Sequence, residues 1–144
     1  MIRIRALGTT DIRVGRTRVR PDAVLAFSVT LYLACTAGTR VRRARLLELF
    51  WPGVPDRERR HALRQLLYRL RGSGLALVVE GDALGVDACD VDSDIAAMLR
   101  DEWVGAAGTD VVIASATVLP GYSPPCHELF RDWLDGLRAR LAAQ

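Results

Sequence analysis

The densest chemistry in the sequence lies in residues 56–71, DRERRHALRQLLYRLR. Four leucines recur there at helical spacing and predict a single apolar stripe: Leu63, Leu66, Leu67 and Leu70. At about 100° per residue, the opposite side carries Arg57, His61, Arg64 and Tyr68, flanked by Arg60 and Arg71. The planar, forked guanidinium suits phosphate oxygens and guanine edges. The pattern favours a helix that enters a DNA major groove; a solvated basic face is the alternative.

This helix is bounded by residues typical of helix ends. Asp56 is the predicted N-cap, and Gly72 stands where a helix usually stops. We expect four side chains to face the groove: Arg57, His61, Arg64 and Tyr68. Arg64 is the candidate for reading a guanine edge with two hydrogen bonds. Phosphate contacts are assigned to four further arginines: Arg60, Arg71, Arg40 and Arg42. His61 could instead have no role, and Tyr68 could pack along the helix flank.

Charge is divided unevenly along the chain. Residues 1–71 carry 16 arginines against 5 acidic residues, a net charge of +11. Residues 72–144 carry 4 arginines against 12 acidic residues, a net charge of −8. This division indicates a polyanionic partner for the first half alone.

Catalytic and metal-binding patterns are weak. Cys126 and His127 are sequence neighbours without the third, orienting group of a nucleophile–base pair. Three aspartates alternate as at the start of a calcium-binding loop: Asp90, Asp92 and Asp94. However, Ile95 stands where that loop needs glycine, and Asp101 stands where it needs a bidentate glutamate. We therefore expect no enzyme, no metal and no cofactor.

The cysteines and the apolar segments indicate a compartment. Three scattered cysteines favour a reducing environment without a disulfide framework. Arg3 and Arg5 interrupt the start of the chain, which argues against a signal peptide. The most apolar run, residues 23–37, is too short to cross a bilayer and is interpreted as a buried helix. We expect a cytoplasmic, nucleoid-associated protein with no membrane partner.

Hydrophobic periodicity predicts the order of the elements. Residues 2–7, 11–14 and 17–20 alternate with period two, which predicts a small antiparallel meander. Its inward residues should be Ile2, Ile4, Ile12, Val14 and Val19, and its arginines should be solvated. Helices are expected at 23–37, with Asp22 as N-cap, and at 43–51. Strands at 75–80 and 83–87 flank the turn Gly81-Asp82 and predict a hairpin.

These elements predict an α+β fold: a winged helix-turn-helix with an N-terminal antiparallel sheet, a C-terminal wing hairpin and a short helical extension. Residues 1–90 would form the DNA-binding domain, and residues 91–144 the helical extension. Residues 87–94 are interpreted as an acidic connector. Helical patterns follow at 94–103, less clearly at 104–122, and again toward the C-terminus. Trp51 and Trp133 are expected to anchor cores.

Residues 46–71 read LLELFWPGVPDRERRHALRQLLYRLR, and LVVEGDALGVD and DVDSD follow. This run resembles the DNA-binding domain of the SARP-type bacterial transcriptional activators, which pair an OmpR/PhoB-like winged helix with a helical bacterial transcriptional activator domain. The layout is similar over residues 1 to about 100. The tail at 118–141 is similar to the opening helices of the activator domain.

The resemblance implies a recognition helix at 56–71 and a wing at 75–87. It implies binding to direct repeats near promoters as head-to-tail pairs, hence a homodimer on DNA, and contact between RNA polymerase and the loop 52–55. Only the start of the activator domain is matched, so we expect either a truncated member of the family or a piece of a longer one.

Two other functions are compatible with the sequence. The chain could be an interaction protein that pairs with a longer regulator through residues 94–144. Trp133, Leu134, Leu137 and Leu141 would then form an exposed docking stripe. Alternatively, charge alone could bind RNA or DNA without sequence preference.

Overall fold

The computed structural model describes residues 1–5, 10–20, 22–94 and 128–142. Residues 95–127 hold most of the helix predicted at 94–103, the segment 104–122, Cys126 and His127, so those predictions lie outside the described residues.

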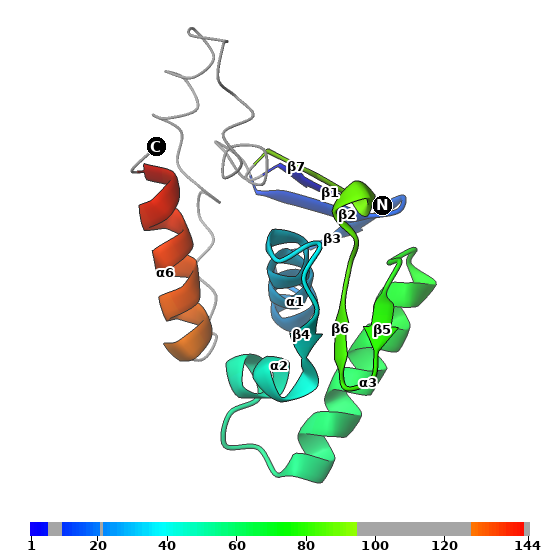
Figure 1. Cartoon of the computed structure of the whole chain (residues 1–144), viewed down its shortest axis with the longest axis vertical. Helices are drawn as coiled ribbons and strands as arrows, with labels where there is room; N and C mark the ends of the chain where they lie inside the picture. Colours follow the sequence, from blue (N-terminus) through cyan, green and yellow to red (C-terminus); the bar gives the residue numbers. More distant parts are fainter. Residues whose placement is uncertain (6–9, 21, 95–127, 143–144) are drawn as a thin grey trace, which may run out of the picture.

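The described elements combine strands and helices in an α+β arrangement (Figure 1). In chain order they are β1 (Ile2–Arg5), β2 (Asp11–Val14), β3 (Thr17–Val19), α1 (Val24–Cys35), β4 (Val41–Arg42), α2 (Arg43–Phe50), α3 (Asp56–Gly72), β5 (Val78–Glu80), β6 (Ala83–Gly85), the 3₁₀ turn η1 (Ala88–Asp90), β7 (Val91–Ser93) and α6 (Glu128–Ala142). No described helix has both the length and the apolar character needed to cross a membrane.

The predicted meander is confirmed as the antiparallel order β3-β2-β1. Its five inward residues are all buried, at 8% exposure or less: Ile2, Ile4, Ile12, Val14 and Val19. The interpretation of its arginines as merely solvated was wrong in part. Arg13 and Arg18 both pair with Asp11, and Arg3 and Arg5 both pair with Asp92.

The sheet has a fourth strand that the sequence pattern did not predict. β7 pairs with β1 in parallel, with Ile2 opposite Val91 and Ile4 opposite Ser93. The segment 87–94 is therefore more than an acidic connector, because it holds η1 and a strand of the first sheet. Because β7 belongs to the first sheet, the N-terminal unit extends beyond the boundary predicted between residues 90 and 91.

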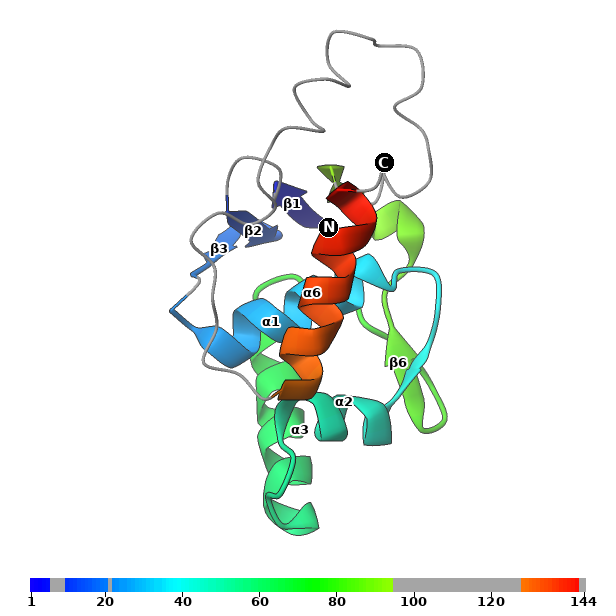
Figure 2. The same ribbon diagram turned by 90° about the vertical axis from the view of Figure 1, so that its left-hand side faces the viewer.

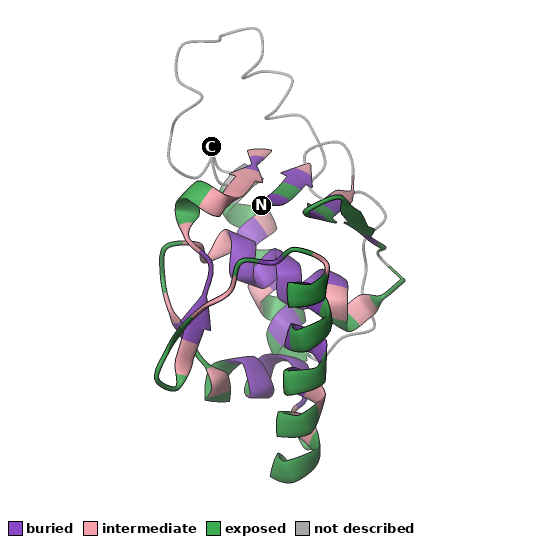
Figure 3. Ribbon diagram, turned by 90° about the vertical axis from the view of Figure 1, so that its right-hand side faces the viewer, coloured by how far each residue is buried: buried purple, intermediate pink, exposed green. Residues whose placement is uncertain are grey.

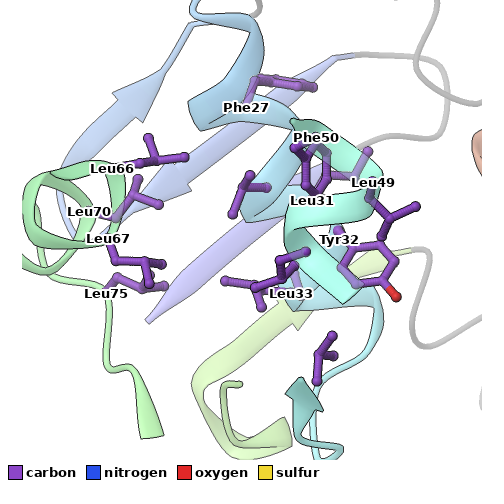
Figure 4. Packing of buried hydrophobic residues seen from close by; sticks show 14 of the residues in the cluster. Phe27, Leu31, Tyr32, Leu33, Leu49, Phe50, Leu66, Leu67, Leu70 and Leu75 are labelled. Carbon is purple, nitrogen blue, oxygen red and sulfur yellow. The ribbon is translucent and has the colours of Figure 1, made fainter. Parts of the chain in front are cut away.

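α1 is the central helix, as its apolar sequence predicts. Its residues 27–34 are all buried, so it contacts neighbours on every side (Figure 4). The expected N-cap was wrong: Ala23 occupies that position without a side-chain bond, and Asp22 pairs with Arg20 instead. Cys35, at the end of the helix, packs against the core, and burial raises the pKa of its thiol to about 12.

β4 connects the first two helices to the hairpin. The hairpin is confirmed, with Val79 opposite Leu84 across the Gly81-Asp82 turn, although β5 and β6 are shorter than predicted. β4 adds a third strand through the pairs Val41–Leu84 and Arg42–Ala83. The hairpin is thereby tied to the start of α2.

α6 packs on the same core as the first three helices (Figure 2). Its buried Phe130 lies 5.0 Å from Phe50 between ring centroids, and Trp133 lies 4.9 Å from Tyr32. Leu134 and Leu137 are buried at 1% and 5% exposure, so the exposed docking stripe of the alternative interpretation is wrong in these two members. The side chain of Leu141 lies outside the described set.

Candidate nucleic-acid interface

α3 presents two chemically different faces. Its leucine stripe, Leu63, Leu66, Leu67 and Leu70, is buried at 2–6% exposure, as its spacing predicts. Burial of four leucines contributes about 1.5–3 kcal/mol each, which fixes the rotation of the helix on the core. The opposite face is exposed along the length of the helix (Figure 3).

The six residues predicted on the outer face and its flanks are all exposed: Arg57, Arg60, His61, Arg64, Tyr68 and Arg71. Tyr68 is 80% exposed, so its ring is available to a partner and does not lie over the helix flank. Within the described part of the chain, none of these four arginines pairs with a carboxylate. Their donors are therefore available to phosphates or bases.

A shallow hollow of about 600 Å³ lies along the middle of this face. Its lining combines hydrogen-bond donors, an amide and an aromatic ring: His61, Arg64, Gln65, Tyr68 and Arg69. Two of these, Gln65 and Arg69, were not among the predicted contact residues. Gln65 could have been found from the same helical spacing, because it lies next to His61 on the outer side.

The start of α3 differs from the prediction. Pro55 occupies the N-cap position, and Asp56 is the first helical residue without a capping bond. The Asp56 carboxylate pairs instead with Arg59, three residues later. Asp56 still favours the helix, because a negative charge in the first turn complements the helix dipole.

Arg40, a predicted phosphate contact, has partners within the chain. Its Nη2 donates to Asp87 Oδ1 at 2.7 Å, and its Nε donates to Glu80 Oε1 at 3.3 Å. The hydrogen bond to Asp87 is the main reason that the pKa of Arg40 is raised. Only 18% of its side chain is exposed, so Arg40 fastens the hairpin to the segment before β4.

Gly85 permits this close packing. A Cβ on Gly85 would lie 2.5 Å from the carbonyl oxygen of Thr39 and 3.5 Å from Arg40 Nη1. A larger residue would therefore separate β6 from the segment that holds Arg40. Arg42, by contrast, is exposed on β4 as the predicted phosphate contact requires.

A second hollow, of about 430 Å³, lies between α2, α3 and the β5–β6 turn. Four arginines line it: Arg43, Arg59, Arg60 and Arg64. Sequence reasoning assigned no role to Arg43 or Arg59. By helical angle, Arg59 falls near the apolar stripe of α3. The position of Arg43 in the hollow depends on where the hairpin folds. Periodicity therefore gives no signal for either residue.

Two carboxylates in the acidic segment 87–94 have arginine partners. Asp87, Cys89 and Asp90 lie with potential ligand atoms within 4.8 Å of one another, but Asp87 already accepts the bond from Arg40. Asp92 accepts a hydrogen bond from Arg5 at 2.8 Å, which is the main cause that lowers the pKa of Asp92. These carboxylates serve the packing of the strands.

Comparison of the sequence with models of known protein families gives no match, and comparison with curated protein sequences gives none either. A function must therefore be argued from the geometry of α3 and its surroundings.

Proposed function

We propose that this protein binds double-stranded DNA in a sequence-specific manner and regulates transcription. α3 would lie in the major groove as the recognition helix, and the β5–β6 hairpin would act as the wing of a winged helix. The observation that carries the proposal is the outer face of α3, where exposed arginines without carboxylate partners among the described residues surround His61 and Tyr68.

The order of elements supports this reading. A helix, a short strand, two helices joined by a short loop and a hairpin follow the N-terminal meander, and this is the order of elements expected of a winged helix-turn-helix. α6 lies across α1 from α3, so it leaves the outer face of α3 open (Figure 1). The resemblance to the SARP-type activators is part of the proposal.

Within this proposal the contacts fall into two classes. Arg57, His61, Arg64 and Tyr68 would face base edges, with Arg64 on guanine. Arg60, Arg71 and Arg42 would hold phosphates, while Arg40 would position the wing. The paired binding at promoter direct repeats and the contact between RNA polymerase and the loop 52–55 rest on the family resemblance.

A binding experiment tests the proposal directly. Duplexes selected from a randomised library would be compared with scrambled duplexes by fluorescence anisotropy at two salt concentrations. We expect the selected sites to bind about 10³-fold more tightly, the lower end of the range for specific recognition. Binding that is equal for every duplex and disappears with salt would instead indicate attraction by charge alone.

A further inference from the structure

The hollow between α2, α3 and the β5–β6 turn, which we name the arginine cleft, concentrates positive charge. Arg43 comes from the start of α2, and Arg59, Arg60 and Arg64 come from α3. Among the residues that the structure describes, the lining has a single acidic member, Asp82 in the hairpin turn. Two helices thus place four guanidinium groups around one space of about 430 Å³, which the hairpin turn borders on a third side.

The four guanidinium groups retain unused donors. Arg43 Nη1 donates to the carbonyl oxygen of Gly81 at 3.1 Å. Its distance from Asp82 Oδ1 is 4.0 Å, which is too long for a hydrogen bond. Arg59 pairs with Asp56 through Nη2, yet its Nε is buried and has no hydrogen-bond partner among the described residues. A buried donor without a partner is unfavourable, so a change of the Arg59 side chain that brought Nε to an acceptor in the cleft would be favoured.

The floor of the cleft is apolar. Leu47 and Leu63 line it at 4% and 2% exposure, together with Ala44. An apolar floor excludes water on one side and strengthens the attraction between the guanidinium groups and an anion. The cleft is therefore better suited to an anion than an equal number of arginines on an open surface would be.

We propose that the arginine cleft is a phosphate-binding site. One guanidinium fork satisfies the two oxygens of a carboxylate, whereas a tetrahedral phosphate offers oxygens to several forks at once. The phosphate could belong to the backbone of duplex DNA, a version that rests on the proposed function. It could also belong to a free phosphorylated small molecule, which does not require DNA binding.

A substitution of Asp82 should change phosphate affinity in the direction opposite to substitutions of the arginines. Its side chain is 78% exposed and adds a negative charge beside the cleft. The bond from the Arg43 backbone N–H to the Asp82 backbone oxygen does not depend on the carboxylate. Asp82→Asn should therefore preserve the turn and raise phosphate affinity, whereas Arg43→Gln and Arg59→Gln should lower it.

The first arm of the experiment uses inorganic phosphate and the full chain. The Nε–Hε signals of arginine are followed by NMR during the titration. We expect phosphate to move the signals of Arg43 and Arg59, and expect Arg43→Gln to weaken binding about fivefold, the effect of one unit charge a few ångströms away in water. Arg45→Gln, on an exposed residue of α2 outside the cleft, is the charge-matched control.

The second arm uses duplex DNA over a range of salt concentrations. If the backbone supplies the phosphate, Arg43→Gln lowers the slope of log affinity against log salt by about 0.9, and Arg45→Gln leaves the slope unchanged. Arg43→Gln is informative even if Arg59→Gln destabilises α3, because Arg43 makes no ion pair within that helix.

The outcomes separate the two proposals. If phosphate binds in the cleft but Arg43→Gln leaves duplex binding unchanged, the site is supported and is assigned to a free phosphorylated ligand. Phosphate binding by a protein that binds no duplex supports the site while the proposed function fails. The inference is overturned if phosphate moves neither signal and Arg43→Gln affects duplex binding no more than Arg45→Gln.

Discussion

Arg64 is the residue on which specificity should depend most. It lines both the hollow along the outer face of α3 and the arginine cleft, so it lies between the proposed base-reading and phosphate-binding surfaces. An arginine that reads guanine through two hydrogen bonds discriminates against other bases, whereas an arginine on phosphate does not.

Arg64→Ala should cost about 1–3 kcal/mol on the selected site and relax the preference at one base pair. Arg71→Ala, near the end of α3, should weaken selected and scrambled duplexes alike and lower the salt slope by about 0.9. Anisotropy titrations of both variants on both duplexes measure these effects. An Arg64→Ala variant with undiminished affinity for the selected site would remove its base-reading role.

The sequence predicted the exposure of the outer arginines but not the partners of every arginine. Helical spacing fixes which side of α3 is polar, and the structure places Arg57, Arg64 and Tyr68 as that spacing requires. The assignment of Arg40 as a phosphate contact did not anticipate its two carboxylate acceptors, which lie 40 and 47 residues later in the chain. Such a pairing depends on how the hairpin folds onto β4, which no local pattern records.

At the scale of elements, periodicity succeeded where one face of an element is buried and the other is solvated. The meander and α3 satisfy this condition, and their bounds were close to those predicted. β7 does not satisfy it, because its three residues are mostly polar and its pairing with β1 joins residues 2–4 to residues 91–93, far apart in the sequence. A parallel partner brought in from far along the chain leaves little signal in a short strand.

The β1–β7 pairing makes a prediction about pH. Arg5 holds the pKa of Asp92 below its usual value, so Asp92 stabilises the fold above about pH 4, and this stabilisation is lost as the pH falls through the lowered pKa. In urea unfolding, the native protein should therefore have a higher free energy of unfolding than Asp92→Asn. This difference should be constant from pH 5 to 8 and shrink below pH 4. Since 43% of the Asp92 side chain is exposed, solvent screening keeps the effect small.

The control for this measurement is Asp132→Asn, which removes an exposed carboxylate on α6 away from the sheet. The difference in free energy of unfolding between the native protein and Asp132→Asn should not follow the pH profile expected for Asp92→Asn. An advantage over Asp92→Asn that persists unchanged at pH 3 would mean that the ion pairs of Asp92 with Arg3 and Arg5 do not stabilise the sheet.

At the scale of the molecule, the described residues share one hydrophobic core. Side chains from the first sheet, from the four helices and from β6 belong to the same buried cluster. α6 enters it through stacked aromatic rings, with Phe130 and Trp133 5.5 Å apart between centroids. Its pattern predicted an apolar stripe correctly, but sequence alone could not decide whether that stripe packs within the chain or meets a partner.

A substitution in α6 should therefore destabilise the whole protein. Phe130 is fully buried, so Phe130→Ala should lower the free energy of unfolding by about 3–5 kcal/mol, a large part of the total for a chain of this size. Leu129→Ala, at a neighbour that is 42% exposed, should cost less than about 1 kcal/mol. Urea unfolding followed by both tryptophan fluorescence and circular dichroism should give a single coincident transition for each variant. Two separate transitions for Phe130→Ala would show that α6 unfolds independently and that the fold around α3 does not depend on it.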